Sequence, residues 1–183
     1  NSDIEWCENN KVILLTVHRR ENIGQLMENI FEAVNRIVKN FKDIRVIYPI
    51  HKNPKVRELA YKFFKDNKMV RMIEPLDVYN FHNLMNKSYM ILTDSGGIQE
   101  EASALGKPVL VLRSTTERPE GVEAGTLKVI GTETTKVYKE IEQLLTNEEV
   151  YICMSKAINP YGDGISSKHI VDIIENYFGE KKE

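Results

Sequence analysis

The sequence predicts an α/β protein, a Rossmann-like three-layer α/β/α domain built on a six-stranded parallel sheet. Short apolar runs alternate along the chain with segments in which apolar residues recur at helical spacing. The apolar runs are continuous, as expected for strands that helices cover on both faces. Because right-handed crossovers join such strands, the loops after their carboxyl ends gather at one edge of the sheet.

Each predicted element has its own signal. The first strand ends in a dense polar loop at residues 18–24, and the second ends at Pro49. The predicted strands are residues 11–17, 44–48, 70–73, 89–92, 108–112 and 127–130. Apolar residues at positions i, i+3, i+4 and i+7 mark the helices between them. The predicted helices are residues 26–41, 56–64, 78–85, 98–105, 137–145, 148–157 and 166–178. Residues 113–125 are predicted to form one long polar loop.

Size and charge limit the class of protein. A chain of 183 residues is long enough for one domain with a full core. We expect residues 1–10 to be an incoming linker, with Ile4 and Trp6 packing on the domain, and residues 11–183 to be that domain. The net charge of -2 argues against a general nucleic-acid binder. The apolar runs are too short to cross a membrane.

Cysteine content and common motifs add further limits. Cys7 and Cys153 have no His or Cys partners at metal-ligand spacing, so we expect no metal site. We also expect no cofactor. Two cysteines also fit a reducing cytoplasm. The sequence lacks a Gly-x-Gly-x-x-Gly after the first strand, a Walker A motif and a Gly-x-Ser-x-Gly elbow.

One turn is the main candidate for a site, the Asp-Ser-Gly-Gly sequence after the fourth strand. Gly96 and Gly97 carry no Cβ, so a ligand can approach the backbone closely. Free N–H groups and the dipole at the start of the following helix favour an anion. We therefore expect Ser95, Gly96 and Gly97 to bind phosphate. The same residues also make a good N-cap and tight turn, so the turn alone leaves both interpretations open.

Basic side chains gather in the loops at the same predicted edge. They are His18, Arg19, Arg20, His51, Arg113 and Arg118. Arginine and histidine donate hydrogen bonds to phosphate, so the group after the first strand is expected to contact an anion. One of Arg113 and Arg118 is expected to reach the ligand and the other to be structural. His51 either contacts the ligand or satisfies its own loop.

Two further residues have two interpretations each. Glu101 either complements the helix dipole or accepts hydrogen bonds from the hydroxyls of a ribose. Its neighbour Glu100 is expected to point to solvent. Phe81 either stacks on a nucleobase or belongs to the core. His82, next to it, is expected to face elsewhere.

Five segments together resemble the non-hydrolysing UDP-N-acetylglucosamine 2-epimerases. They are His18-Arg-Arg-Glu-Asn22, Pro49-Ile-His51 with Asn53-Pro54, Thr93-Asp-Ser-Gly-Gly97 with Gln99-Glu-Glu101, Thr-Thr-Glu-Arg-Pro-Glu-Gly with Glu-Ala-Gly-Thr in residues 115–126, and Asn159-Pro-Tyr-Gly-Asp-Gly164. Their order and spacing match over nearly the whole chain. That family has two Rossmann-like domains facing each other across a cleft, the architecture of GT-B glycosyltransferases. This chain resembles the second, C-terminal half, which holds UDP.

The resemblance implies a role for each candidate residue. Ser95, Gly96 and Gly97 would bind the diphosphate, Glu101 the ribose and Phe81 the uracil. His18 and Arg118 would act at the phosphates or the reacting sugar. Arg19 and His51 resemble positions that contact a second, activating UDP-sugar in some bacterial members. The implied ligands are UDP and UDP-N-acetylhexosamine, and the implied assembly is a homodimer of the full-length protein in the cytoplasm.

The resemblance also implies a reaction, the inversion at C2 of UDP-GlcNAc to give UDP-ManNAc through elimination and re-addition of UDP. The family's acids and bases lie in the first domain, which is absent here, so this chain alone is expected to bind UDP weakly without turnover. The family's last helix reaches across to that domain, so its apolar face is expected to be partly unpaired here or to find another chain. Three alternatives remain: the corresponding half of a GT-B glycosyltransferase, a hydrolysing epimerase, and a stand-alone nucleotide-sugar-sensing module.

Overall fold

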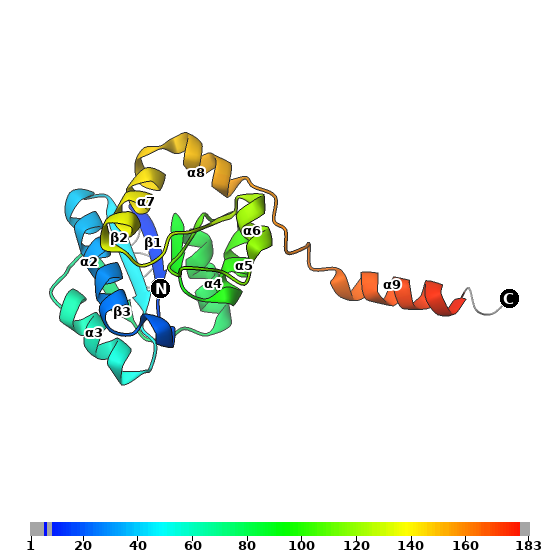
Figure 1. The fold of residues 1–183 in the computed structure, drawn as a ribbon, viewed down its shortest axis with the longest axis horizontal. Coiled ribbons are helices and arrows are strands. Elements are labelled where there is room, and N and C mark those ends of the chain that lie inside the picture. Colours follow the sequence, from blue (N-terminus) through cyan, green and yellow to red (C-terminus); the bar gives the residue numbers. More distant parts are fainter. Residues whose placement is uncertain (1–5, 7–8, 180–183) are drawn as a thin grey trace.

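The sheet forms the centre of the molecule (Figure 1). The computed structural model describes Trp6 and residues 9–179. The strands are β1 (Lys11–Thr16), β2 (Ile44–Pro49), β3 (Val70–Ile73), β4 (Met90–Thr93), β5 (Val109–Val111) and β6 (Leu127–Val129). They pair in parallel in the order β3-β2-β1-β4-β5-β6, which is the Rossmann order. The predicted fold class is confirmed, and each predicted strand is present to within one residue at each end.

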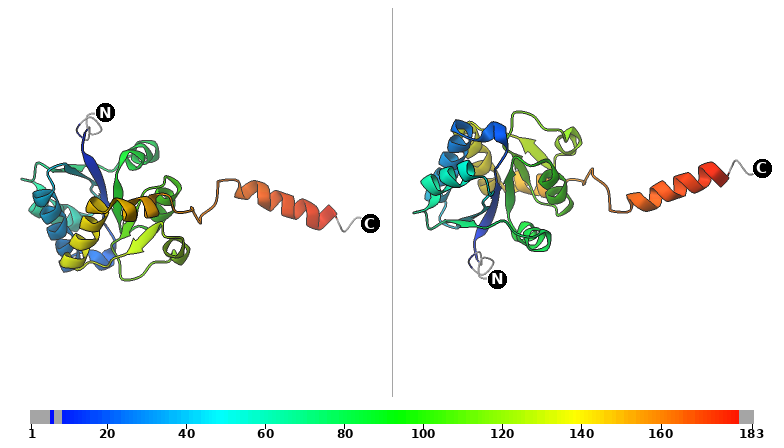
Figure 2. Two further views of the ribbon diagram at one scale, coloured as in Figure 1. Left: turned by 90° about the horizontal axis from the view of Figure 1, so that it is seen from above. Right: turned by 90° about the horizontal axis from the view of Figure 1, so that it is seen from below.

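Two helical layers cover the sheet on opposite faces (Figure 2). One layer contains α2 (Gln25–Asn40), α3 (Pro54–Phe64) and α7 (Thr134–Thr146), and the other contains α4 (Val78–Lys87), α5 (Gly96–Ala104) and α6 (Pro119–Ala124). A further helix, α8 (Glu148–Ser155), packs against α7. The predicted helices are therefore present.

Burial on both faces explains the continuous apolar strands. Successive side chains of β1 point to opposite faces of the sheet. Ile13 and Leu15 join the core on the α2 side, whereas Val12 and Leu14 join the core on the α4 side. All four are at most 3% exposed. A polar side chain at any of these four positions would be buried, which costs free energy unless it finds a hydrogen-bond partner, as Thr16 at the end of the strand does with Thr93.

The prediction of one unbroken polar loop at residues 113–125 is wrong. Pro119 to Ala124 form α6, and a short 3₁₀ helix, η1 (Arg20–Asn22), also lies in the polar loop after β1. Proline in the first turn and Gly125 at φ 81° are the ordinary start and stop signals of a helix. The sequence analysis did not identify α6 because the helix is short and has little apolar periodicity.

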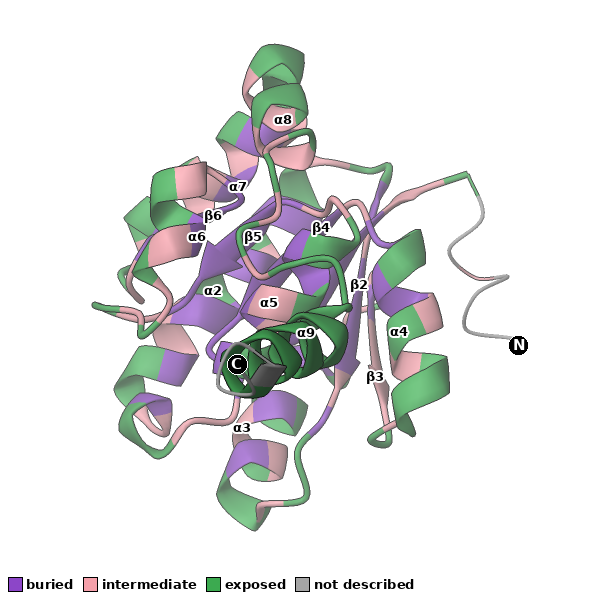
Figure 3. Cartoon of the chain, turned by 90° about the vertical axis from the view of Figure 1, so that its right-hand side faces the viewer, coloured by how far each residue is buried: buried purple, intermediate pink, exposed green. Residues whose placement is uncertain are grey.

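The two ends of the chain differ in their contacts. Trp6 lies beside the guanidinium groups of Arg45 and Arg71, at 5.8 and 4.6 Å from its ring centroid. Its predicted packing is confirmed, whereas Ile4 lies outside the described residues. The last helix, α9 (Ser166–Gly179), lies apart from the domain (Figure 1), and its described residues are exposed (Figure 3). Its apolar side chains are exposed, namely Ile170, Val171, Ile173, Ile174, Tyr177 and Phe178. The apolar face of this helix is therefore exposed to solvent in the described part of the chain.

Candidate functional site

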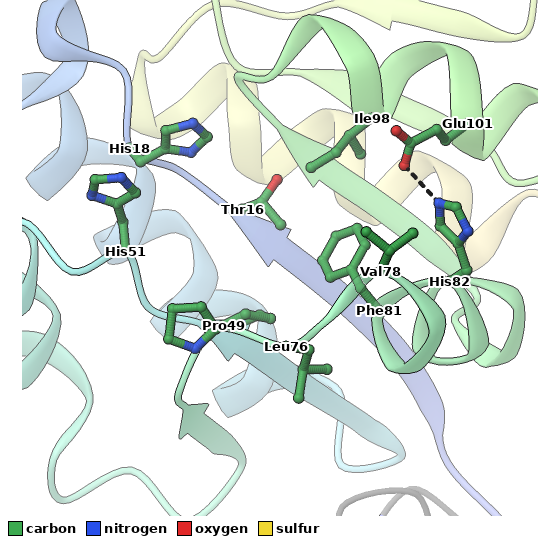
Figure 4. Close-up of a pocket in the computed structure, with 11 residues that line it drawn as sticks. Thr16, His18, Pro49, His51, Leu76, Val78, Phe81, His82, Ile98 and Glu101 are labelled. Atoms are coloured by element: carbon green, nitrogen blue, oxygen red, sulfur yellow. Dashed lines mark hydrogen bonds and ion pairs between the residues drawn. The ribbon is translucent and has the colours of Figure 1, made fainter.

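A pocket of about 340 Å³ opens at the carboxyl edge of the sheet (Figure 4). Its walls come from the ends of β1 and β2, from the start of α4 and from α5. They are formed by Thr16, His18, Pro49, His51, Pro75, Leu76, Val78, Phe81, His82, Ile98 and Glu101. β1 and β4 are neighbours at the centre of the sheet, where the strand order reverses. Open parallel sheets bind ligands at this switch point.

One part of the pocket is an apolar slot. Phe81 and Val78 from α4 lie across from Ile98 of α5, and Leu76 and Pro49 extend the same wall. Such a slot suits a flat ring, which gains apolar contact on both faces. Phe81 also packs on the core beneath α4, so its position is compatible with both of its predicted roles.

The acidic group of the pocket is Glu101, and it has a histidine partner. His82 Nε2 lies 3.0 Å from Glu101 Oε2, and both side chains are 45% exposed. The expectation that His82 faces away from the site is therefore wrong. Val78, Phe81 and His82 are spaced i, i+3 and i+4, which places them on one face of α4. This spacing is the signal in the sequence that could have identified His82.

Two histidines form another wall. The rings of His18 and His51 are stacked, with centroids 5.2 Å apart and an interplanar angle of 12°. His18 Nδ1 lies 3.5 Å from Asp94 Oδ1. Burial lowers the pKa of His18 below its ordinary value of 6.5; Asp94 opposes this effect, while His51 and Arg19 reinforce it. The imidazole is therefore neutral at pH 7, with one N–H donor and one acceptor nitrogen.

Asp94 fixes the loop that carries His18. Its carboxylate is fully buried and accepts hydrogen bonds from the backbone N–H groups of His18 and Arg19, the shortest at 2.8 Å. It also accepts one from Asn22 Nδ2, at 3.0 Å. These bonds tie the end of β1 to the end of β4. Sequence reasoning placed Asp94 at this edge without recognising its structural role.

The glycine turn lies at the start of α5. Ser95 is the N-cap residue, yet its side chain makes no capping hydrogen bond. Neither Gly96 nor Gly97 has a positive φ. A Cβ on Gly97 would have only Glu101 Oε1 within 4 Å, at 3.7 Å. Backbone conformation and packing therefore do not require glycine at position 97, which favours the interpretation that a ligand approaches there.

The predicted arginines lie beside this turn and are not among the pocket-lining residues. Arg19 Nη2 is 3.3 Å from Glu117 Oε1, and that carboxylate also pairs with Arg113. Glu117 Oε1 would be 3.3 Å from a Cβ on Gly96. The ion-paired group of Arg19, Arg113 and Glu117 therefore borders the start of α5. Arg118 occupies the N-cap position of α6 without a side-chain capping hydrogen bond, and its guanidinium pairs with Glu100. The expectation that Glu100 simply points to solvent is therefore wrong.

The structure thus separates the candidate residues into two groups. His18, His51, Phe81 and Glu101 meet in the pocket, together with the unpredicted His82. The other candidates border it, with Ser95, Gly96 and Gly97 opening α5 and Arg19 and Arg118 in ion pairs nearby. Within the described part of the chain, no group of three or more His, Cys, Asp or Glu side chains is arranged to hold a metal ion. The same part contains no helix long and apolar enough to span a membrane.

Strand order and the position of the pocket define a Rossmann-like α/β domain with its ligand site at the switch point. Comparison with known proteins identifies the family. The family model for UDP-N-acetylglucosamine 2-epimerase matches residues 1–175. The chain therefore belongs to the UDP-N-acetylglucosamine 2-epimerase family.

Individual relatives agree with this assignment. The chain is 59% identical over 173 residues to the UDP-N-acetylglucosamine 2-epimerase of Bacillus subtilis, a match that covers 94% of this chain and 46% of that protein. The S. aureus MnaA–UDP co-structure has a TM-score of 0.93 at 56% identity and matches 98% of this chain and 49% of that one. UDP-GlcNAc 2-epimerase from Neisseria meningitidis bound to UDP-GlcNAc has a TM-score of 0.88 at 43% identity, covering 96% of this chain and 50% of that one. This chain therefore spans about half the length of these relatives.

Proposed function

We propose that this chain is the UDP-binding, C-terminal half of an enzyme that interconverts UDP-GlcNAc and UDP-ManNAc without hydrolysing them. The observation that carries the proposal is the combination of an apolar slot, a half-exposed carboxylate and a glycine turn at one sheet edge. A uracil, a ribose and a diphosphate need these three features in this order. The match to a UDP co-structure over 98% of the chain supports the same ligand.

Within this proposal, each part of UDP has its own residues. Uracil occupies the slot beside Phe81, and the ribose hydroxyls donate to Glu101. The diphosphate accepts from Ser95 and from the backbone N–H groups of Gly96 and Gly97, where the helix dipole adds a favourable charge. We assign residues 11–183 to this UDP-binding domain, with α9 as its projecting last helix, and residues 1–10 to a linker.

The remaining candidates lie where the sugar and its phosphates would be. His18 is neutral, so it can donate one hydrogen bond to a phosphate oxygen without carrying a charge itself. Arg118, held by Glu100, supplies a cation to the same region. Arg19 and His51 contact a second UDP-sugar that activates the enzyme. The stacking of His51 on His18 and the ion pair of Arg19 with Glu117 place both residues near the proposed nucleotide site.

The chemistry follows from this arrangement. A base removes the proton at C2 of the sugar while the C1–O bond to UDP breaks, which leaves 2-acetamidoglucal and UDP. UDP then adds back to C1, and a proton returns to the opposite face of C2. Preorganised donors stabilise the charge that develops on the leaving diphosphate. The base and acid that move the C2 proton belong to the other half of the protein.

The proposal includes partners beyond the ligand. The N-terminal half completes the active site, so this chain alone binds UDP weakly and does not turn over. The full-length protein is a homodimer in the cytoplasm. An exposed free thiol at Cys153 is consistent with a reducing compartment.

The test is a complementation experiment. This chain is mixed with UDP-GlcNAc, with and without the first half of the protein, and the products are followed by NMR. The proposal predicts UDP-ManNAc only when both halves are present. Free ManNAc and UDP would instead indicate a hydrolysing enzyme. Saturable UDP binding with no product in either mixture would indicate a sensing module.

A further inference from the structure

The contact between His82 and Glu101 joins two elements that are separate in the sequence. His82 belongs to α4, and Glu101 belongs to α5, 19 residues later. Their side chains meet across the wall of the pocket at 3.0 Å (Figure 4). Leu84 and Met85, later on α4, are buried in the core, which fixes the helix that carries the histidine.

The two oxygens of the Glu101 carboxylate have different surroundings. Oε2 faces His82 Nε2. Oε1 faces the glycine turn, 3.7 Å from the position that a Cβ of Gly97 would occupy. Within the described part of the chain, the side chain hydrogen-bonded to this carboxylate is His82. One hydrogen bond at Oε2 therefore fixes the direction in which the other lone pairs of the carboxylate point.

Stability alone does not account for this pair. Both side chains are 45% exposed, and ion pairs between exposed groups contribute little to folding. Orientation matters more for a carboxylate that must meet two vicinal hydroxyls, because both hydrogen bonds require a single plane and distance.

We propose that His82 is a positioning residue, which orients the Glu101 carboxylate toward the 2′- and 3′-hydroxyls of a bound nucleotide. This inference rests on the proposed function, since it assumes that a ribonucleotide occupies the pocket. Its consequence is selectivity: His82 acts on the preference for ribose over deoxyribose, not on affinity for the base or the phosphates.

The test compares UDP with 2′-deoxyuridine diphosphate by isothermal titration calorimetry of the 183-residue chain. Wild type should prefer UDP. His82→Ala should reduce that preference by about three- to tenfold, the effect of one hydrogen bond, and should change affinity for the deoxynucleotide much less. His82→Gln places an N–H donor near the position of Nε2 and should retain most of the preference. His169→Ala, on exposed α9, is the matched control and should leave both affinities unchanged.

The outcomes separate the two proposals. Equal weakening of both nucleotides by His82→Ala, or an unchanged ratio, would overturn the positioning role while leaving UDP binding intact. No binding of either nucleotide to the wild type would overturn the proposed function, and the positioning role with it. Thermal melts accompany each titration. If His82→Ala does not fold, His82→Asn replaces it; its shorter side chain cannot reach the carboxylate, so the preference should fall with Asn and persist with Gln.

Discussion

Asp94 shows how one buried carboxylate organises several site residues. It accepts hydrogen bonds from the backbone of His18 and Arg19 and from the Asn22 amide, and it lies beside the His18 ring. Each donor comes from the loop after β1, so this loop is fixed to the end of β4. A carboxylate is the only ordinary side chain that can accept this many hydrogen bonds without donating any.

Replacing this carboxylate should therefore lower the stability of the domain. Asp94→Asn introduces an NH₂ group against donors that already point at the site. We expect the free energy of unfolding to fall by about 1–3 kcal/mol, because at least one buried donor loses its acceptor. Urea denaturation measures the change. Asp43→Asn, at an exposed aspartate, should stay within about 0.5 kcal/mol of wild type. An Asp94→Asn protein as stable as that control would show that the network contributes little.

His18 gives the stability of the domain a pH dependence. Its pKa in the folded protein lies below the ordinary 6.5, mainly because of burial. At pH values between the folded-state pKa and 6.5, the unfolded chain therefore binds more protons than the folded protein. The contribution of neutral His18 is fully present above pH 6.5 and is lost as the pH falls through the lowered value. His18→Gln removes this term, so its melting temperature should fall less than that of wild type between about pH 7.5 and 5.

The control for this comparison is His169→Gln, at an exposed histidine of α9, which should follow the wild-type curve. Parallel curves for His18→Gln and wild type over this pH range would show that His18 has the same pKa in both states.

At the scale of elements, burial separates α9 from the other long helices. Ile173 on α9 is 67% exposed, whereas Ile141 on α7 is fully buried. The same substitution should therefore change the stability by very different amounts at the two positions. Ile141→Ala should cost about 2–5 kcal/mol of unfolding free energy, and Ile173→Ala should change it by less than about 0.5 kcal/mol. Chemical denaturation of the two variants provides the comparison, and a large loss from Ile173→Ala would mean that α9 packs on the domain.

The elements also show what the sequence can predict. Strands covered on both faces need continuous apolar runs, so residues 11–17 and 89–92 were recognisable at once. The short helix α6 was missed because six residues give too little periodicity, although Pro119 and Gly125 mark its ends. The hydrophobic pattern of the sequence therefore predicts helices and strands that bury a full apolar face. It does not predict short helices whose bounds depend mainly on their first and last residues.

For the site as well, the sequence predicts some features and not others. Topology brings His18, His51 and Glu101 to one edge, and that much follows from strand order alone. The partner of Glu101 does not, because it depends on how α4 is rotated against α5. Likewise, the pairing of Arg118 with Glu100 depends on the position of α6, which the sequence did not predict.

At the scale of the whole molecule, our proposal is that this domain works together with a second half. This chain spans about half the length of its relatives, and its last helix carries an apolar face that nothing in the described part of the chain covers. The central claim concerns this half alone: a diphosphate binds where α5 begins, beside the pocket at the switch point.

Gly97→Asp tests this claim directly. A Cβ at position 97 meets only Glu101 Oε1 within 4 Å, and aspartate is favourable in the first turn of a helix, so the domain should still fold. The new carboxylate would occupy the space of a phosphate. Calorimetric titration with UDP should therefore show saturable binding to wild type and at least about tenfold weaker binding to Gly97→Asp. Ala104→Asp, at the other end of α5, should bind UDP like wild type. Equal UDP affinity in wild type and Gly97→Asp would contradict the claim.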